Sequence, residues 1–396
     1  MAAALDGLVV LDLGRILAAP TCTQLLGDLG ATIWKIENPA TGGDDTRSWG
    51  PPFAKDSQGN DTDLSAYFMA ANRNKQSVAV NIATAEGQRL IRQLAARADV
   101  LIENFKPGGL QKYGLDAETL RGAYPSLVYC SLSGYGQTGP NRHKPGYDLM
   151  AQGFGGIMSL TGAPDGMPMK VGVGIADVVC GLYAAVGILA ALLHRSRSGE
   201  GQHIDIALVD TQMAWLVNEG VNFLTTGQVP KRRGNGHPNI VPYQVFRVRD
   251  GHVIVAVGND GQFRRFCDFL GLPELAEQPE YATNPARLAH RRALVARIEA
   301  QLAPKGLDEV IAGLEARKVP AGPVNTLDRA LHSPQAQARD MVIQMDHPEV
   351  GPLQLLGNPL KLSATPVSYR HPPPRLGAHT EALHAMLEQG DRNPQG

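Results

Sequence analysis

Residues 8–13 read Leu-Val-Val-Leu-Asp-Leu, an almost wholly apolar run typical of a strand buried on both faces. A short loop over residues 14–20 leads to a helical pattern at 21–29, and Gly30 separates that pattern from a second strand-like run at 31–36. Elements of the same two kinds follow, with strands predicted at 77–82, 99–102 and 127–132 and a helix at 86–97. Strands that alternate with helices in this way predict a parallel sheet covered on both faces, and therefore an α/β, Rossmann-like fold.

The pattern changes twice further along the chain. Residues 134–168 are rich in Gly, Pro and Asn, and residues 225–242 in Gly, Pro, Lys and Arg, which is typical of loops and linkers. Beyond them, two strand-like runs flank Asp250-Gly251 and predict a hairpin, and helical patterns follow it. We therefore predict a large Rossmann-like domain over 1–225, a smaller α+β domain over 226–325, and a C-terminal segment over 326–396.

Composition narrows the class of protein. The 396 residues include 37 Lys and Arg against 38 Asp and Glu, a formal net charge of −1, which argues against a nucleic-acid-binding protein. The N-terminus lacks a basic and apolar leader, and the apolar run at 178–193 is shorter than the roughly 20 residues of a membrane span. The four cysteines form no Cys-x-x-Cys pair and indicate no metal site and no disulfide framework. We expect a cytoplasmic protein.

The familiar phosphate-binding and nucleophile motifs do not occur. The loop after the first strand lacks the glycines of Gly-x-Gly-x-x-Gly, which a dinucleotide pyrophosphate needs for close backbone approach. Neither Gly-x-x-x-x-Gly-Lys-[Ser/Thr], Gly-x-Ser-x-Gly nor His-Glu-x-x-His is found. A Rossmann-like shape without its fingerprint predicts that another ligand is bound.

Asp177 stands directly before the apolar run, in Gly174-Ile-Ala-Asp177. Local sequence favours a structural role, because Asp is a preferred residue for capping a helix N-terminus. The alternative is a nucleophile: a helix N-terminus lowers the pKa of a carboxyl group, and the backbone amides stabilise an oxyanion. A carboxylate is competent toward a thioester, whose thiolate leaves readily.

Cationic side chains lie on loops that follow successive predicted strands. Because such loops converge at the carboxyl edge of a parallel sheet, they predict a site for a phosphorylated, adenine-bearing ligand. The candidates are Arg73, Lys75, Lys112 and Lys144.

Seven short stretches together resemble the class III CoA-transferases, the group of formyl-CoA transferase and carnitine CoA-transferase. They are residues 5–12, 103–108, 146–148, 174–177, 198–202, 319–324 and 376–380, so that the resemblance covers nearly the whole chain. The resemblance implies an interlocked homodimer whose large domain is built from both chain ends. It also implies that coenzyme A and acyl-CoA are substrates, with no tightly bound cofactor.

The resemblance further implies a ping-pong reaction in which Asp177 is the nucleophile. Asp177 forms an anhydride with the donor acyl group, then a thioester with CoA, and the acceptor acid reverses these steps. Matching motif positions imply that CoA contacts Arg15, Ile16, Ala18, Lys75, Asn104, Phe105, Lys112 and Lys144.

Departures from the family pattern bear on the substrate. Leu17 stands where formyl-CoA transferase has a Gln that handles oxalate, and Tyr147 stands where the α-methylacyl-CoA racemases have a His base. A Gly-rich lid has its counterpart in Gly234, Asn235, Gly236 and His237.

The lid region resembles the branch that uses succinyl-CoA with dicarboxylates such as glutarate, and Arg232, Arg233 or His237 is then a candidate partner for the distal carboxylate. Two alternatives stay open: a racemase or epimerase acting on an acyl-CoA, and a CoA-binding protein without catalysis in which Asp177 only caps a helix.

Overall fold

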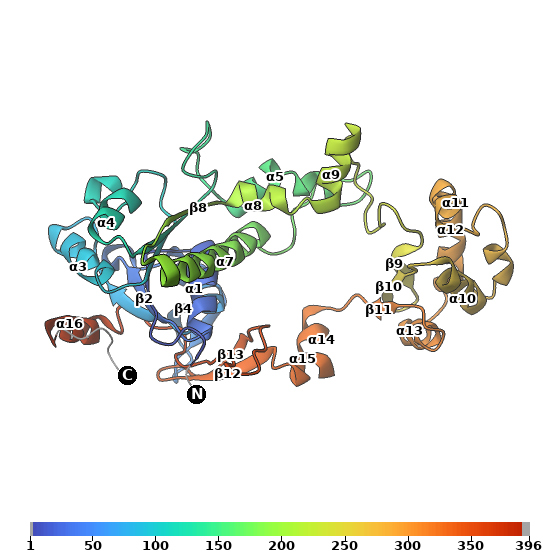
Figure 1. Cartoon of the computed structure of the whole chain (residues 1–396). Coiled ribbons are helices and arrows are strands. Elements are labelled where there is room, and N and C mark those ends of the chain that lie inside the picture. The colour runs from blue at the N-terminus through green and yellow to red at the C-terminus, as the bar shows by residue number, and fades with distance from the viewer. Residues whose placement is uncertain (1–2, 390–396) are drawn as a thin grey trace. The chain divides into compact units, whose positions relative to one another are not determined.

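The computed structural model describes residues 3–389 and divides the chain into two compact units (Figure 1). The first unit comprises Met1–Met158, Lys170–Gln228 and Pro334–Gly396, and the second comprises Ser159–Met169 and Val229–Ser333. The predicted boundaries at 225 and 325 lie three and eight residues before the limits at Gln228 and Ser333. Residues 159–169, which the prediction gave to the large domain, belong with the second unit.

A six-stranded parallel sheet forms the centre of the first unit, in the order β5-β2-β1-β6-β7-β8. The strands are β1 (Val9–Asp12), β2 (Thr32–Glu37), β5 (Gln76–Ala79), β6 (Val100–Glu103), β7 (Val128–Ser133) and β8 (His203–Ala207). The order runs outward from β1 in one direction and from β6 in the other. The predicted Rossmann-like α/β fold is confirmed, and β1 and β6 flank the switch point at which such sheets bind ligands.

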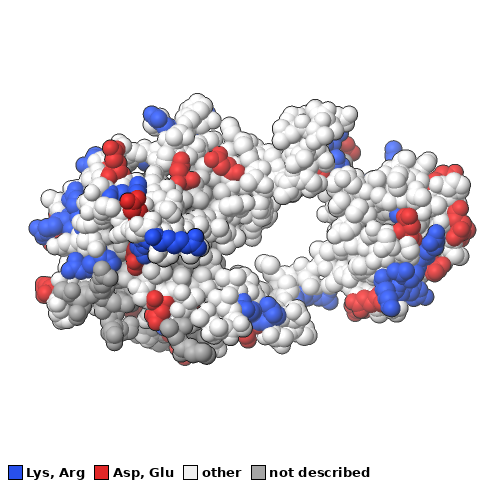
Figure 2. All heavy atoms as spheres, viewed as in Figure 1, with Lys and Arg blue, Asp and Glu red and all other residues white. Residues whose placement is uncertain are grey.

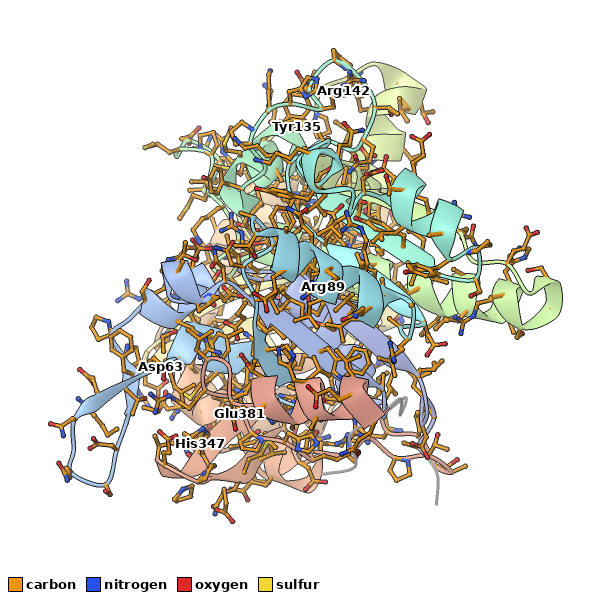
Figure 3. The ribbon with its side chains drawn as sticks, turned by 90° about the vertical axis from the view of Figure 1, so that its left-hand side faces the viewer. Asp63, Arg89, Tyr135, Arg142, His347 and Glu381 are labelled. Atoms are coloured by element: carbon orange, nitrogen blue, oxygen red, sulfur yellow. The ribbon has the colours of Figure 1, made fainter. Side chains whose placement is uncertain are left out.

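The two faces of the sheet are buried in separate cores. Val10 packs with one core and its neighbours Val9 and Leu11 with the other, because successive side chains of a strand point to opposite faces. The first core contains residues of α1 (Ala18–Asp28), α7 (Ile175–Ser198) and α8 (Leu208–Ala214). The second contains residues of α3 (Ala85–Ala95), α4 (Ala117–Ala123) and α16 (Thr380–Gln389). Figure 3 looks onto this second face, where Arg89 of α3 and Glu381 of α16 are labelled.

Helix α7 begins at Ile175, three residues before the apolar run at 178–193. Within residues 3–389 it is the one helix long and apolar enough to cross a membrane. One of its faces, however, is buried in the first core of the first unit. At Gly181, a Cβ atom would lie 2.5 Å from the Ala18 carbonyl oxygen of α1. Glycine at this position therefore allows α1 and α7 to pack closely.

The remaining elements of the first unit lie outside the large sheet. Hairpins β3 (Phe53–Lys55) with β4 (Asp61–Ser65) and β12 (Val342–His347) with β13 (Gly351–Leu356) share a small core. Asp63 and His347, which belong to these two hairpins, are labelled in Figure 3, and Arg375 pairs with both Asp63 and Glu349. The short helices are α2 (Ala66–Ala70), α5 (Asp148–Phe154), α9 (Val217–Thr226) and α15 (Pro334–Ala338), and α6 (Ile157–Leu160) spans the boundary between the units.

The C-terminal segment returns to the large sheet. The Thr380 Oγ accepts a hydrogen bond from the Ala79 amide of β5 at 2.9 Å, and the His379 amide donates to the Ser77 carbonyl. Leu383 and Met386 of α16 are buried in the second core. Both ends of the chain therefore build the first unit.

The second unit has its own apolar core around a three-stranded antiparallel sheet. Strands β9 (Tyr243–Val248) and β10 (Gly251–Ala256) form the predicted hairpin, and β11 (Ala321–Pro323) completes the sheet. The helices are α10 (Asp260–Leu270), α11 (Asn284–Ala289), α12 (Arg291–Leu302), α13 (Leu307–Glu315) and α14 (Leu327–Leu331). Figure 2 shows Lys and Arg interspersed with Asp and Glu on the visible face, which agrees with the balanced charge of the sequence.

Candidate active site

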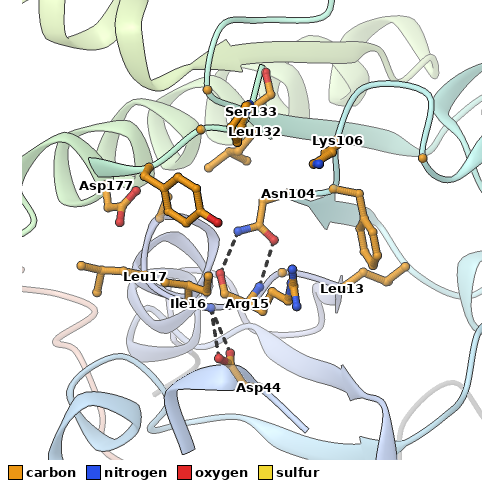
Figure 4. A pocket seen from close by; sticks show the side chains of 18 of the residues that line it. Leu13, Arg15, Ile16, Leu17, Asp44, Asn104, Lys106, Leu132, Ser133 and Asp177 are labelled. Atoms are coloured by element: carbon orange, nitrogen blue, oxygen red, sulfur yellow. Dashed lines mark hydrogen bonds between the residues drawn. The ribbon is translucent and has the colours of Figure 1, made fainter. Parts of the chain in front are cut away.

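A cavity of about 870 Å³ lies at the carboxyl ends of β1, β2, β6 and β7 in the first unit (Figure 4). Its position at the switch point of the sheet is the one expected for the ligand of such a fold. Most of the residues proposed from the sequence line it. They are Arg15, Ile16, Leu17, Ala18, Asn104, Phe105, Lys112, Lys144, Tyr147 and Asp177.

Asp177 is the third residue of α7, and Gly174 occupies the N-cap position. The capping role considered for Asp177 is therefore wrong. Within residues 3–389 its carboxylate accepts no hydrogen bond, and it faces the pocket in Figure 4. Burial and then the charge of Asp148 raise the pKa of Asp177 to about 7. The expectation of a lowered pKa at the helix N-terminus is wrong, because burial and the charge of Asp148 both raise the pKa.

Asp148 supplies the cap that Gly174 cannot. Its Oδ1 accepts the amide of Ala176 at 2.8 Å and that of Asp177 at 3.4 Å. The Asp148 Oδ2 in turn accepts a hydrogen bond from Gln152 Nε2 at 2.7 Å. Asp148 and Gln152 were not predicted as site residues, although the Gly146-Tyr-Asp148 motif contained a signal for Asp148.

The loop between β1 and α1 forms one wall of the pocket, and it is held from two sides. Ile16 has φ of 71°, a left-handed conformation that is rare for a β-branched residue. Its amide donates to both carboxylate oxygens of Asp44, while Asn104 accepts from the Arg15 amide at 3.0 Å and donates to the Arg15 carbonyl at 2.7 Å (Figure 4). These bonds fix the backbone of a loop that the sequence analysis assigned to CoA.

A buried ion-pair cluster supports this loop from below. Lys35 Nζ lies 2.8 Å from Asp44 Oδ2 and 2.9 Å from the Gly14 carbonyl oxygen, and the Lys35 side chain is fully buried. Burial opposes ionisation of Asp44, but Lys35 and the Thr46 donors lower its pKa to about 2. This cluster was not predicted, because a lysine inside a strand gives no local indication of its partner.

Two of the proposed cationic ligands lie elsewhere. Lys75 is fully buried, and its Nζ contacts Asp12, Asn72 and the Pro20 carbonyl. Arg73 is also buried and forms a two-bond pair with Asp28 at 2.9 and 2.6 Å. Neither residue lines the pocket, so the predicted contacts of Lys75 and Arg73 with CoA are corrected to structural ion pairs.

Other cations and aromatic residues do line the pocket. Lys112 and Lys144 are exposed there, as expected, and Lys106 and Lys170 join them, although the sequence analysis did not select these two. Exposed ammonium groups suit phosphates. Trp49 and Tyr67 also line the pocket, and their rings meet edge to face at a centroid distance of 5.1 Å.

The expected lid residues belong to the second unit. Gly234 has φ of 59°, a conformation that favours glycine, and the His237 amide donates to the Tyr243 carbonyl at 3.0 Å. Arg232 is engaged within this unit, where its Nη2 donates to the Gly166 carbonyl at 2.6 Å. The roles of Arg233, Gly234, Asn235, Gly236 and His237 toward substrate stay predictions.

Metal chemistry has no support in the arrangement of side chains. Within residues 3–389, no group of three or more His, Cys, Asp or Glu side chains is placed to hold a metal ion. The four cysteines, Cys22, Cys130, Cys180 and Cys267, are buried free thiols.

Comparison with known proteins identifies the family of the chain that forms this pocket. The model of CoA-transferase family III matches residues 5–380. The chain belongs to CoA-transferase family III. It is therefore an enzyme of the CoA-transferase class, and CoA thioesters are its substrates.

Named relatives align with nearly the whole chain. It is 46% identical to the succinate–glutarate CoA-transferase of Agrobacterium fabrum, over 98% of this chain and 96% of the relative. It is 40% identical to the human succinyl-CoA:glutarate CoA-transferase, over 98% of this chain and 87% of the relative. A solved structure of a CAIB/BAIF family protein from Brucella suis is 47% identical, superimposes with a TM-score of 0.87, and covers 98% of this chain and 100% of its own.

Proposed function

We propose that this family III CoA-transferase moves CoA from succinyl-CoA to a dicarboxylic acid such as glutarate, with Asp177 as the nucleophile. The observation that supports the nucleophile most directly is the free Asp177 carboxylate at the wall of the pocket, beside a helix N-terminus that another residue caps. The names of the aligned relatives support the two substrates.

Four steps account for the transfer. The Asp177 carboxylate attacks the thioester carbonyl, forming a mixed anhydride and releasing CoA thiolate. The thiolate attacks the aspartyl carbonyl of the anhydride, which gives an aspartyl-CoA thioester and frees succinate. The acceptor carboxylate attacks that thioester to form a second anhydride, and the returning thiolate attacks its acceptor-derived carbonyl. The product acyl-CoA leaves, and the Asp177 carboxylate is regenerated without any net change in protons or electrons.

In this proposal, different pocket residues bind different parts of the acyl-CoA. Lys106, Lys112, Lys144 and Lys170 provide positive charge for the phosphates of CoA. Phe105 provides an apolar ring for contact with CoA. Asp177 lies at the end of the pocket where the thioester reacts.

The experiment that tests this function is exchange between succinyl-CoA and glutarate, followed by mass spectrometry of the CoA esters. Wild-type protein should convert succinyl-CoA to glutaryl-CoA, and Asp177→Asn should reduce turnover at least about a thousandfold. Because Asp177 is not the N-cap, its replacement by Asn should leave the fold intact. Intact-mass analysis should find a CoA adduct on the wild type and none on the variant.

Two outcomes would contradict the proposal. Retained exchange in Asp177→Asn would exclude this nucleophile. Solvent deuterium entering the α carbon of an acyl-CoA without any CoA exchange would instead support the racemase alternative.

For the distal carboxylate of the dicarboxylic acid we propose Arg233. The resemblance of residues 234–244 to the branch that uses succinyl-CoA with dicarboxylates supports this choice, because a guanidinium binds a carboxylate through two parallel hydrogen bonds. Arg233→Ala should raise KM for glutarate about tenfold or more and leave KM for succinyl-CoA nearly unchanged. Full activity of this variant on glutarate would exclude Arg233.

We also propose a cytoplasmic homodimer, interlocked as the family resemblance implies. The observation that supports association is an apolar stripe on α7 at helical spacing, where Leu182, Val186, Leu189 and Leu193 are 46%, 65%, 36% and 56% exposed. Light scattering should give twice the mass of the 42.3 kDa chain, and a monomer of full activity would contradict the proposal.

A further inference from the structure

The first turn of α7 lacks a capping side chain of its own. Its N-cap is Gly174, which has no side-chain acceptor, and the turn bears Ala176 and Asp177 as its second and third residues. Free amides at this end of a helix need an acceptor. Asp148, 28 residues earlier in the chain, provides that acceptor at 2.8 Å from the Ala176 amide.

Asp148 is itself held in place. Gln152, fully buried one turn further along α5, donates from Nε2 to Asp148 Oδ2 at 2.7 Å. The Gln152 Oε1 accepts the amide of Val171 at 2.9 Å, and residues 171–174 lead directly into α7. Two side chains of α5 thus fix both the approach to α7 and its first turn.

We propose that Asp148 is a positioning residue for Asp177, holding the turn that bears the nucleophile and facing it with a second negative charge. This inference rests on the proposed role of Asp177. It assigns Asp148 no contact with the reacting atoms, because its effect passes through the amides of α7 and through space.

Several ionisable groups near Asp177 enter the electrostatic part of the proposal. Asp148 on α5 faces it, Tyr67 on α2 and Cys180 on α7 interact with its charge, and Lys144 and Lys170 line the same pocket. Burial first and Asp148 second raise the pKa of Asp177 to about 7. A carboxylate of raised pKa is a more basic nucleophile, and it loses activity as pH falls through 7.

A purely structural cap and the proposed positioning role predict different results for Asp148→Asn. The asparagine oxygen can still accept the α7 amides, but its Nδ2 then faces the Gln152 Nε2 donor, so the melting temperature should fall, by less than in Asp148→Ala. Removal of the negative charge should lower the pKa of Asp177, so the acid limb of kcat/KM should move to lower pH by about one unit. A structural cap alone would leave that limb in place.

Asp148→Ala removes the acceptor as well as the charge. Because the first turn of α7 then lacks its acceptor, kcat should fall about tenfold or more while KM for succinyl-CoA changes less. The matched control is Glu86→Gln, which removes an exposed acid from the first turn of α3, away from the pocket lining, and should change neither property.

The experiment is the pH profile of kcat/KM between pH 5 and 9 for wild type, Asp148→Asn, Asp148→Ala and Glu86→Gln, with Asp177→Asn in parallel. The inference would be overturned if wild type and Asp148→Asn had the same acid limb, or if Asp148→Ala kept full kcat. The proposed function would still stand in that case, provided that Asp177→Asn is inactive. Retained turnover in Asp177→Asn would instead overturn the proposed function. If Asp148→Ala does not fold, the profile of Asp148→Asn still decides.

Discussion

The Ile16 amide donates to both carboxylate oxygens of Asp44, at 3.1 and 3.2 Å. The same carboxylate pairs with the fully buried Lys35 at 2.8 Å. Because the left-handed backbone of Ile16 is unfavourable for a β-branched residue, surrounding bonds must hold it in place. Asp44 therefore connects the buried ion pair with Lys35 to the backbone conformation of the pocket loop at Ile16.

Loss of the Asp44 carboxylate should destabilise the first unit. Asp44→Ala leaves the buried ammonium of Lys35 without its nearest partner, and we expect a fall of about 3–5 kcal/mol in the free energy of unfolding, measured by urea denaturation. The neighbouring Asp45→Asn is the control, because Asp45 forms an exposed pair with Arg15 and should change stability by less than about 1 kcal/mol.

The stability that Asp44 contributes should depend on pH in a defined direction. Its pKa is lowered to about 2 in the native state, so the contribution is present above about 4 and is lost as pH falls through 2. Equal losses of stability in Asp44→Ala and Asp45→Asn would contradict this account.

Asn104 should affect substrate binding through the loop that it clamps. Its amide makes two hydrogen bonds to the backbone of Arg15, so Asn104→Ala leaves both partners without these bonds. We expect KM for succinyl-CoA to rise about tenfold with a smaller change in kcat, measured by initial rates. A fall in kcat at unchanged KM would place Asn104 in the chemical step instead.

Lys75 and Lys112 should respond differently to the same substitution, since one is buried and the other is exposed in the pocket. Lys75→Met leaves Asp12 without its ion-pair partner, and we expect a loss of about 3 kcal/mol or more of stability. Lys112→Met should leave stability nearly unchanged and raise KM for acyl-CoA, with a weaker dependence of KM on salt concentration. A raised KM in a stable Lys75→Met would restore the contact that the sequence analysis assigned to Lys75.

These cases show which parts of the site could be predicted from sequence. The apolar runs of β1 and β2 and the alternation of strands and helices predicted the sheet, whereas the site residues in the loops after β1 and β6 came from the family resemblance. The hydrogen bonds that cap α7 and support Ile16 could not be predicted, because each joins residues that are 28 positions apart in the sequence. Lys75 was assigned to CoA because the sequence does not show that Asp12 lies beside it in the fold.

Glu103, at the end of β6, should make stability depend on pH in the opposite direction from Asp44. It is buried, and its Oε2 accepts the Phe105 amide at 2.7 Å. Burial raises its pKa to about 7, although hydrogen bonds from Ser131 and the Phe105 amide oppose the shift. The native state therefore holds a proton that the unfolded chain releases near pH 4.5, and stability from this group falls as pH rises from 4.5 to 7.

Glu103→Gln replaces the ionisable group with a neutral one that can still accept the Phe105 amide. We expect the variant to be more stable than wild type by about 1–3 kcal/mol at pH 8 and nearly equal to it at pH 5, as measured by urea denaturation at the two pH values. Glu118→Gln, at an exposed position in the first turn of α4, should show no such difference. A Glu103→Gln variant less stable than wild type at pH 8 would mean that the ionised carboxylate is needed where it stands, to hold the turn that begins at Phe105.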